Sequence, residues 1–209
     1  MGRRPATKPR KRASQERSRA TVAALVEATA RILVSEGFDK ASTNRIAEVA
    51  GVSVGSLYQY FPSKEALVIA VAERHHQDIM QVVRGTLGRI AGLPVEDAVR
   101  SIVAVAVDAH RIDPKLHCVL SEQIPRTDRL ENVDPVNREA HDLFRAYLES
   151  RRDELQVTNV ELAAFVCATS IEAVAHHAVL HQSKMPPEEV DLLINEASRM
   201  IVGYLKRTQ

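Results

Sequence analysis

The sequence predicts an all-α protein of about nine helices, and three observations support that prediction. Ala, Leu, Val, Glu and Arg are abundant, Trp is absent, and runs of β-branched residues are few. Apolar residues recur three and four positions apart along most of the chain, which is the period of a helix with one buried face. Glycine, proline and N-capping residues separate these segments at helix-sized intervals. With 45% hydrophobic residues, a chain of 209 residues can enclose a substantial core.

Residues 1–13 are basic and contain two prolines and no apolar anchor. This composition predicts a disordered arm, either a solvated tail or an arm that contacts a nucleic-acid backbone or minor groove. The first helix is expected to begin at Ser14 and to end at Gly37, a left-handed cap, with Phe38 folded back on the last turn. Its predicted buried stripe consists of Val22, Leu25, Val26, Thr29, Ile32 and Leu33.

Two short helices separated by a glycine turn follow. Ser42 or Thr43 can cap the first, and Gly51 suits the positive φ with which the chain leaves that helix. Ser53 can cap the second helix, and Pro62 stops it. Their inward-facing residues are Ile46, Ala47, Ala50, Leu57 and Phe61. A helix, a tight turn and a second helix form the helix-turn-helix unit, whose second helix fits the DNA major groove.

The outer face of the second short helix carries the candidate DNA-contacting groups. Val54, Gly55 and Ser56 are small, so the backbone can approach DNA and its free N–H groups can meet phosphate. Tyrosine hydroxyls can donate to phosphate oxygens while their rings pack on sugar or on a thymine methyl. Alternatively, the tyrosines pack the domain and Lys64 is a solvated charge. The candidate DNA-binding residues are Thr43, Asn44, Ser53, Val54, Gly55, Ser56, Tyr58, Gln59, Tyr60 and Lys64.

The chain resembles the DNA-binding domain of the TetR family of bacterial transcriptional repressors over roughly residues 15–67, with the motif at 43–67. The matching residues are Thr43, Ile46-Ala47, Ala50-Gly51-Val52-Ser53, Gly55, Leu57-Tyr58, Tyr60-Phe61, Ser63-Lys64 and Leu67. The resemblance implies that Thr43, Tyr60 and Lys64 contact phosphates. It also implies positions at bases or backbone for Asn44, Val54, Gly55, Ser56 and Tyr58.

Charge is divided unevenly along the chain. Residues 1–68 contain 12 Lys and Arg against 6 Asp and Glu, and the remainder contains 16 against 21. A basic N-terminal third on an acidic body is expected of a DNA-binding head joined to a body with another role. The predicted domains are a basic arm at 1–13, a helix-turn-helix domain at 14–62, and a helical effector-binding and dimerisation domain at 63–209.

The body is predicted to remain helical. A fourth helix starts at Ser63 and runs to about Val83, before Gly85, Gly88 and Gly92 loosen the chain. Further helices are expected over 95–112, 115–123, 134–155, 158–181 and 188–206, with a loop at 126–133 and a capping box at 158–161. The last two helices are apolar on more than one face, and the resemblance implies that they pair with their copies in a homodimer.

The expected activity of the body is binding of a small-molecule effector between helices. Candidate lining residues are His117, Cys118, Phe144, Tyr147, Phe165 and Cys167. For each of them, a place in an ordinary core is the alternative. The two cysteines form no Cys-x-x-Cys pattern, and a redox switch between them is a further alternative.

Other functional classes receive little support from the sequence. His176, His177, His181 and Glu172 offer helical spacings for a metal, but no second cluster supplies further ligands, so no metal site is expected. No nucleophile elbow, phosphate loop or dinucleotide-binding turn occurs, so neither an enzyme nor a cofactor is expected. No apolar stretch of ~20 residues and no signal peptide are recognised, which predicts a cytoplasmic protein without a membrane partner. The resemblance implies that this protein is bacterial and nucleoid-associated.

The residues and the resemblance together predict a homodimeric repressor that binds a palindromic double-stranded DNA operator and is released by a small-molecule effector. In this interpretation the effector moves the fourth helix and changes the separation of two DNA-binding heads. An activator or a nucleoid-type DNA binder with the same head is an alternative. A helical enzyme or metal-binding module that carries a DNA-binding head is the alternative from another class.

Overall fold

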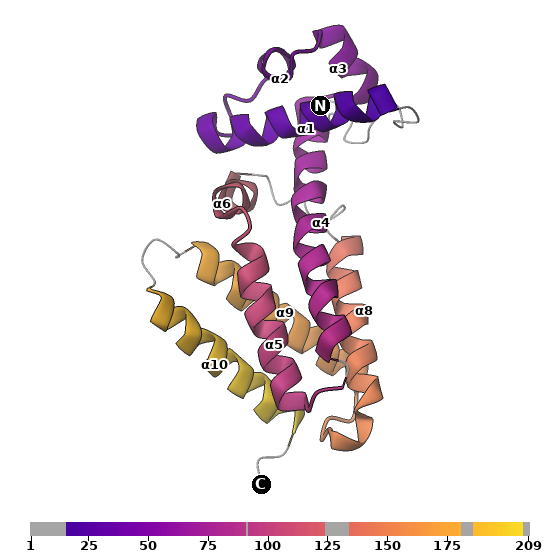
Figure 1. Ribbon diagram of the computed structural model, residues 1–209, viewed down its shortest axis with the longest axis vertical. Helices are drawn as coiled ribbons and strands as arrows, with labels where there is room; N and C mark the ends of the chain where they lie inside the picture. The colour runs from indigo at the N-terminus through magenta and orange to yellow at the C-terminus, as the bar shows by residue number, and fades with distance from the viewer. Residues whose placement is uncertain (1–15, 91, 124–133, 181–185, 207–209) are drawn as a thin grey trace, which may run out of the picture. The chain divides into compact units, whose positions relative to one another are not determined.

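The computed structural model describes residues 16–90, 92–123, 134–180 and 186–206 (Figure 1). Within these ranges the secondary structure consists of nine α-helices and a short 3-10 helix, without a strand, which confirms the all-α prediction. Contacts divide the chain into two compact units. Unit 1 contains α1 (Glu16–Glu36), α2 (Thr43–Val49), α3 (Val54–Tyr60), α4 (Lys64–Ile90) as far as His75, and α6 (Pro114–Gln123) from Lys115. Unit 2 contains α4 from His76, α5 (Val95–His110), α8 (Asp134–Ser150), the 3-10 helix Arg152–Glu154, α9 (Val160–Leu180) and α10 (Pro187–Leu205).

This division differs from the boundary expected at residue 63. α4 contributes to both units, and α6 joins the unit that contains the N-terminal helices although it follows α5 in the chain. Leu116 and Leu120 of α6 are the reason, because they are buried in the same apolar cluster as the residues of α1 to α3. The basic arm at 1–13, the expected start at Ser14 and the expected loop at 126–133 lie outside the described residues.

α1 buries the stripe that its periodicity predicts. Leu25, Val26, Thr29, Ile32 and Leu33 are all buried, and Val22 packs against them. Gly37 ends the helix at φ 82°, and its N–H donates to the carbonyl of Leu33 at 3.1 Å, as expected for a left-handed cap.

Side-chain caps and one glycine define α2 and α3. Ser42, and not Thr43, is the N-cap of α2, because its Oγ accepts the backbone N–H of Arg45 at 3.3 Å. Ser53 caps α3 by accepting a backbone N–H from its first turn at 3.1 Å. Between the helices Gly51 adopts φ 67°, so the predicted glycine turn is confirmed.

α4 is longer than predicted. Ser63 caps its start as expected, since its Oγ accepts the N–H of Ala66 at 3.2 Å. The helix then continues through Gly85 and Gly88 to Ile90, so these glycines do not end it. A glycine inside a helix costs only about 1 kcal/mol relative to alanine. Burial of α4 side chains before and after these two glycines offsets that cost. The buried side chains in this part of α4 are Ile79, Met80, Thr86 and Ile90.

Two glycine substitutions are expected to change stability in opposite directions. A Cβ added at either Gly51 or Gly85 would meet no atom within 4 Å, so only the backbone conformation distinguishes them. Gly51→Ala should destabilise by about 1–2 kcal/mol because it forces a side chain into the left-handed region. Gly85→Ala should stabilise by about 0.5–1 kcal/mol because it removes helix-interior glycine. Urea unfolding of both variants measures the two signs, and equal shifts would contradict the assigned conformations.

Unit 2 is a helical bundle with its own core. α5 packs against α9 and α10, and α8 packs against α9 (Figure 1). The fully buried side chains that join these helices include Val95, Val99, Val103, Val107, Leu148, Ala163, Ala164, Ala175 and Leu205. Small alanines on α9 let the neighbouring helices approach closely, while valines and leucines fill the remaining space.

Several helix ends in unit 2 differ from their predicted positions. α8 starts at Asp134 as expected but ends at Ser150, and a 3-10 turn follows it. The side chain of Asn159 caps α9 by accepting the N–H of Leu162 at 3.0 Å, so the cap lies one residue beyond the predicted Thr158. By length and composition alone, α9 is apolar enough to cross a membrane, contrary to the expected absence of such a stretch. Core helices of soluble proteins meet the same criterion, and one face of α9 packs in the core of unit 2.

Candidate nucleic-acid interface

α3 is anchored on one face and exposed on the other. Leu57 is fully buried, and Phe61, directly after the helix, is buried in the same cluster. On the opposite face Gly55 and Gln59 are exposed, and the Tyr58 side chain is 40% exposed. This arrangement agrees with the predicted inward positions of Leu57 and Phe61 and with the predicted outward position of Tyr58. The outward groups are therefore available to a large partner, and a short helix of this kind fits the major groove of DNA.

Hydroxyl groups link the exposed residues of α2 and α3. Thr43 Oγ1 and the Tyr58 hydroxyl lie 3.1 Å apart and share a hydrogen bond. At the start of α3, Ser53 Oγ donates to Ser56 Oγ at 2.9 Å. Asn44 is exposed beside Thr43, whereas Val54 is half-buried. Most of the candidate DNA-binding residues thus lie at the starts of the two helices or on the outward face of the second.

Tyr60 differs from the other candidates because it is buried. Its ring packs in the core of unit 1, and its hydroxyl donates to Ser18 Oγ of α1 at 3.1 Å. The ring of Tyr60 therefore packs the domain, which was the alternative weighed for the tyrosines. The contrast with Tyr58, two residues earlier, follows from the helical period, because residues two positions apart point to nearly opposite sides of a helix.

Lys64 is bound within unit 1. Its Nζ donates to the carbonyl of Phe38 at 3.1 Å and lies 4.0 Å from the centroid of the Phe38 ring. The ammonium thus joins the first turn of α4 to the turn after α1 by a hydrogen bond and a cation–π contact. An ammonium has three N–H donors, so this hydrogen bond leaves donors for a phosphate.

Lys64→Gln is expected to separate these two roles. Glutamine keeps an N–H donor for the Phe38 carbonyl on a side chain one bond shorter, but it loses the cation–π contact and carries no charge for a phosphate. The variant should therefore keep most of the thermal stability, while the slope of log affinity for DNA against log salt falls by about one unit. Lys64→Ala is the companion variant that loses both interactions. Binding titrations at three salt concentrations measure the slope, and an unchanged slope for both variants would remove Lys64 from the phosphate contacts.

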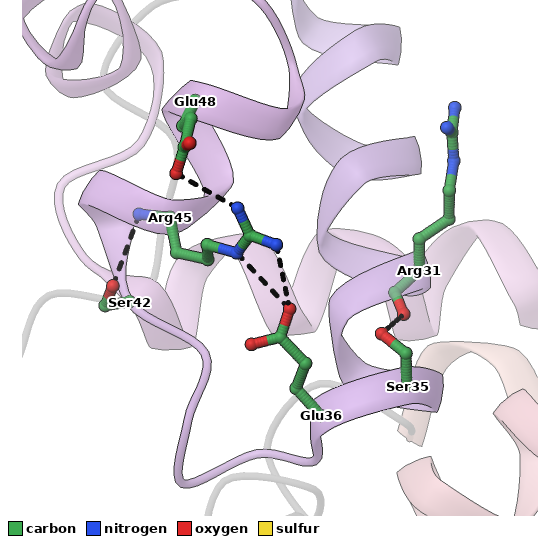
Figure 2. Close-up of polar contacts among 6 residues, drawn as sticks. All are labelled: Arg31, Ser35, Glu36, Ser42, Arg45 and Glu48. Atoms are coloured by element: carbon green, nitrogen blue, oxygen red, sulfur yellow. Dashed lines mark hydrogen bonds and ion pairs between the residues drawn. The ribbon is translucent and has the colours of Figure 1, made fainter.

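Sequence patterns did not indicate the role of Arg45. Its Nε and Nη2 both donate to Glu36 Oε1 at 3.3 Å, and its Nη1 donates to Glu48 Oε2 at 3.0 Å (Figure 2). Hydrogen bonding to Glu48, and then to Glu36, raises the pKa of the Arg45 guanidinium. Because Glu36 ends α1 whereas the other two residues belong to α2, the cluster ties these helices together. The pair with Glu48 has a visible i, i+3 spacing, but the contact with Glu36 depends on the turn at Gly37.

The six candidate effector-lining residues do not come together in one unit. Phe144, Tyr147 and Cys167 are buried in the core of unit 2, where the rings of Phe144 and Tyr147 stack with centroids 6.4 Å apart. Phe165 belongs to the same unit but is 58% exposed, and its ring meets the edge of His141. His117 and Cys118 belong to unit 1.

Burial disfavours thiolate chemistry at one of the two cysteines, Cys167. Burial raises the pKa of the Cys167 thiol to about 12. Cys118 belongs to the other unit and is partly exposed. A redox switch between them therefore gains no support from the described residues.

Histidines in the described part of the chain form a pair but no metal cluster. His75 Nε2 and His117 Nδ1 lie 3.2 Å apart in the core of unit 1, and this hydrogen bond joins α4 to α6. Among the described residues no three His, Cys, Asp or Glu side chains are grouped as a metal site. His176 and His177 lie on α9, and His181 lies outside the described residues.

Unit 1 has the features of a helix-turn-helix DNA-binding protein. They are two short capped helices, a glycine turn with positive φ between them, and an exposed polar face on the second helix. Residues 25–71 match a family model described as bacterial regulatory proteins, tetR family. Residues 94–205, more than half of the chain, match the tetracyclin repressor-like C-terminal domain. The chain belongs to the TetR family of bacterial regulators.

Curated relatives match only part of this chain. The nucleoid occlusion factor SlmA of Haemophilus ducreyi is 29% identical over 118 residues, which cover 56% of this chain and 55% of that protein. The HTH-type transcriptional activator FasR of Mycolicibacterium smegmatis is 40% identical over 63 residues, which cover 30% of this chain and 29% of that protein. The matches thus span about half or less of the length of these relatives.

Solved structures share the fold along nearly the whole chain. The fatty acid degradation regulator FadR of Bacillus halodurans aligns with a TM-score of 0.69 at 18% identity, covering 95% of this chain and 100% of that one. FadR of Bacillus subtilis in complex with stearoyl-CoA aligns with a TM-score of 0.68 at 16% identity, covering 88% and 98%. SmeT, the repressor of the Stenotrophomonas maltophilia multidrug efflux pump SmeDEF, aligns with a TM-score of 0.63 at 20% identity, covering 90% and 93%. At these identities the similarity establishes the fold alone.

Proposed function

We propose that this protein is a homodimeric repressor that binds a palindromic DNA operator and is released by a small-molecule effector. The observation that carries the proposal is the two-faced α3, which buries Leu57 in unit 1 and exposes Tyr58 and Gln59. A short helix held in this way presents a small set of donors and acceptors to base edges in the major groove. Such a protein would act on the nucleoid DNA of a bacterial cytoplasm.

A second copy of the chain is the partner proposed for the exposed apolar face of unit 2. α9 and α10 contact each other and bury their other faces in the core. Their large exposed apolar side chains are Leu162, Phe165, Val166, Leu192, Met200 and Tyr204. So large an exposed apolar surface favours a protein partner, and a two-fold dimer also supplies the second head that a palindrome needs.

The effector is proposed to bind in unit 2. Phe144, Tyr147 and Cys167 give its interior an apolar character with a phenol at one edge, where the Tyr147 hydroxyl donates to the Leu93 carbonyl at 3.3 Å. The bound stearoyl-CoA of Bacillus subtilis FadR and the efflux-pump role of SmeT favour a largely apolar effector. α4 belongs to both units, so it is the proposed connection between effector and head. A nearly complete release requires about a 10⁴-fold preference of the effector for the DNA-incompetent state.

Two relatives favour a second candidate function. FasR is an activator and SlmA is a nucleoid occlusion factor, and this chain matches part of each. Activation and nucleoid binding are therefore roles found among proteins similar to this one. The position of bound sites relative to promoters distinguishes a repressor from these alternatives.

Selection of bound sequences from random duplex DNA tests the proposal. A palindromic consensus, bound with a salt slope that reports several phosphate contacts, is the expected result. The selected duplex is then titrated with acyl-CoA esters and with hydrophobic drugs, and at least one class should release the protein. Salt-dependent binding without a consensus would contradict operator recognition and favour the nucleoid-type alternative.

A further inference from the structure

A hydrogen bond between two side-chain hydroxyls joins α2 to α3 at the surface of unit 1. Thr43 is the first residue of α2, and Tyr58 lies in the middle of α3, fifteen residues later. Their oxygens are 3.1 Å apart, and either one can be the donor. Tyr58 is 40% exposed, so this hydrogen bond restrains a side chain that core packing holds less firmly than a buried one.

The chemistry of the pair leaves one proton for a partner. Each hydroxyl has one O–H donor and acceptor lone pairs, and the bond between them uses one of the two protons. When Thr43 donates to Tyr58, the phenol keeps its own proton for an acceptor on DNA. A phenol that also accepts a hydrogen bond becomes a better donor, because hydrogen bonds in a chain polarise one another. The tether also fixes the direction of that donor before DNA arrives, which reduces the ordering cost of binding.

Tyr60 provides the contrast within the same helix. Its hydroxyl is bonded at the same 3.1 Å distance to Ser18 of α1, but its ring is buried in the core. Core packing already fixes that ring, whereas the exposed Tyr58 has no comparable burial. The hydroxyl of Thr43 is therefore important for the orientation of Tyr58.

We propose that Thr43 is a positioning residue whose hydroxyl holds the Tyr58 phenol in the orientation that discriminates operator from other DNA. This inference rests on the proposed function, because it assigns a role within operator recognition. It differs from a phosphate contact made by Thr43 itself. In the positioning role Thr43 acts through Tyr58, so the effect of removing its hydroxyl depends on whether the Tyr58 hydroxyl is present.

A double-mutant cycle tests this dependence. Wild type, Thr43→Val, Tyr58→Phe and the double variant are titrated against the selected operator and against a scrambled duplex at two salt concentrations. Thr43→Val should weaken operator binding by roughly 3–10-fold in the wild-type background and by less than about 2-fold in the Tyr58→Phe background. Thr43→Ser, which keeps the hydroxyl, should restore operator preference. Thr21→Val is the matched control, because the Thr21 hydroxyl bonds only to the Arg17 carbonyl of its own helix among the interactions described, at 2.9 Å.

The outcomes separate the positioning role from its rivals. Equal losses from Thr43→Val in both backgrounds would mean that Thr43 contacts DNA independently, and this would overturn the inference. No loss in either background, or equal losses on operator and scrambled DNA, would overturn it as well. Thermal unfolding of each variant shows whether a loss of DNA binding is due to misfolding. If Thr43→Val misfolds, the inference requires that Thr43→Ser keeps the operator preference of the wild type and that Tyr58→Phe loses it; any other result would overturn the inference. A wild-type protein without any operator preference would instead refute the proposed function.

Discussion

Asp substitutions at Phe165 and Leu192 should split the dimer and abolish operator binding. These side chains are 58% and 62% exposed on α9 and α10, so the changes leave the core of unit 2 intact. In the proposed dimer, each substitution occurs twice across the two-fold axis and buries unpaired carboxylates. Such burial costs several kcal/mol, and each 1.4 kcal/mol weakens dimerisation about tenfold. Because one head reads too few base pairs, operator affinity should fall by at least about 100-fold.

Sedimentation measures the oligomeric state and DNA titration measures the affinity of these variants. Ile112→Asp is the matched control, because Ile112 is an exposed apolar residue of unit 2 that lies on neither α9 nor α10. The control should remain dimeric and bind the operator normally. A dimer that persists in both the Phe165 and the Leu192 variants would show that this face is not the interface.

Alanine substitutions at the adjacent residues Leu57 and Tyr58 should produce opposite phenotypes. Leu57 is fully buried in unit 1, so Leu57→Ala removes core packing and should destabilise that unit by about 2–5 kcal/mol. Tyr58→Ala removes a partly exposed side chain and its hydrogen bond to Thr43, so stability should fall by only about 1 kcal/mol. Its operator affinity, however, should fall by about 1–3 kcal/mol, and its affinity for random DNA should fall less.

Urea unfolding and paired DNA titrations distinguish these phenotypes. Unit 2 has a separate core, so the transition assigned to it should remain in the Leu57→Ala variant. Equal losses of stability in the two variants would contradict the two-faced α3. If Tyr58→Ala weakens binding to operator and to random DNA equally, Tyr58 contacts the sugar-phosphate backbone of DNA and does not recognise bases.

The helix-turn-helix could be predicted because its determinants are local in sequence. Capping serines, the glycine at φ 67° and the four-residue spacing of Leu57 and Phe61 all act within one or two turns of helix. The buried stripe of α1 followed from the same periodicity. Even there, the choice between Ser42 and Thr43 as the cap required the geometry of the first turn.

Features that depend on distant contacts could not be predicted. α6 belongs to the N-terminal unit because Leu116 and Leu120 pack there, and no local pattern shows which core will receive an amphipathic helix. Lys64 reaches the Phe38 carbonyl 26 residues earlier in the chain, and the Thr43–Tyr58 bond likewise spans the turn. Phe165 is apolar and was expected in the body's interior, but α9 turns it outward.

Binding of the wild-type protein to a complete palindrome and to an isolated half-site tests the central claim most directly. The account predicts that two protomers bind the complete site and that a half-site binds at least about 100-fold more weakly. It also predicts that inserting five base pairs between the half-sites weakens binding strongly, because the second head then faces the opposite side of the duplex. Equal affinity for the half-site and the complete site, with one protomer on each, would contradict a dimeric operator-binding regulator.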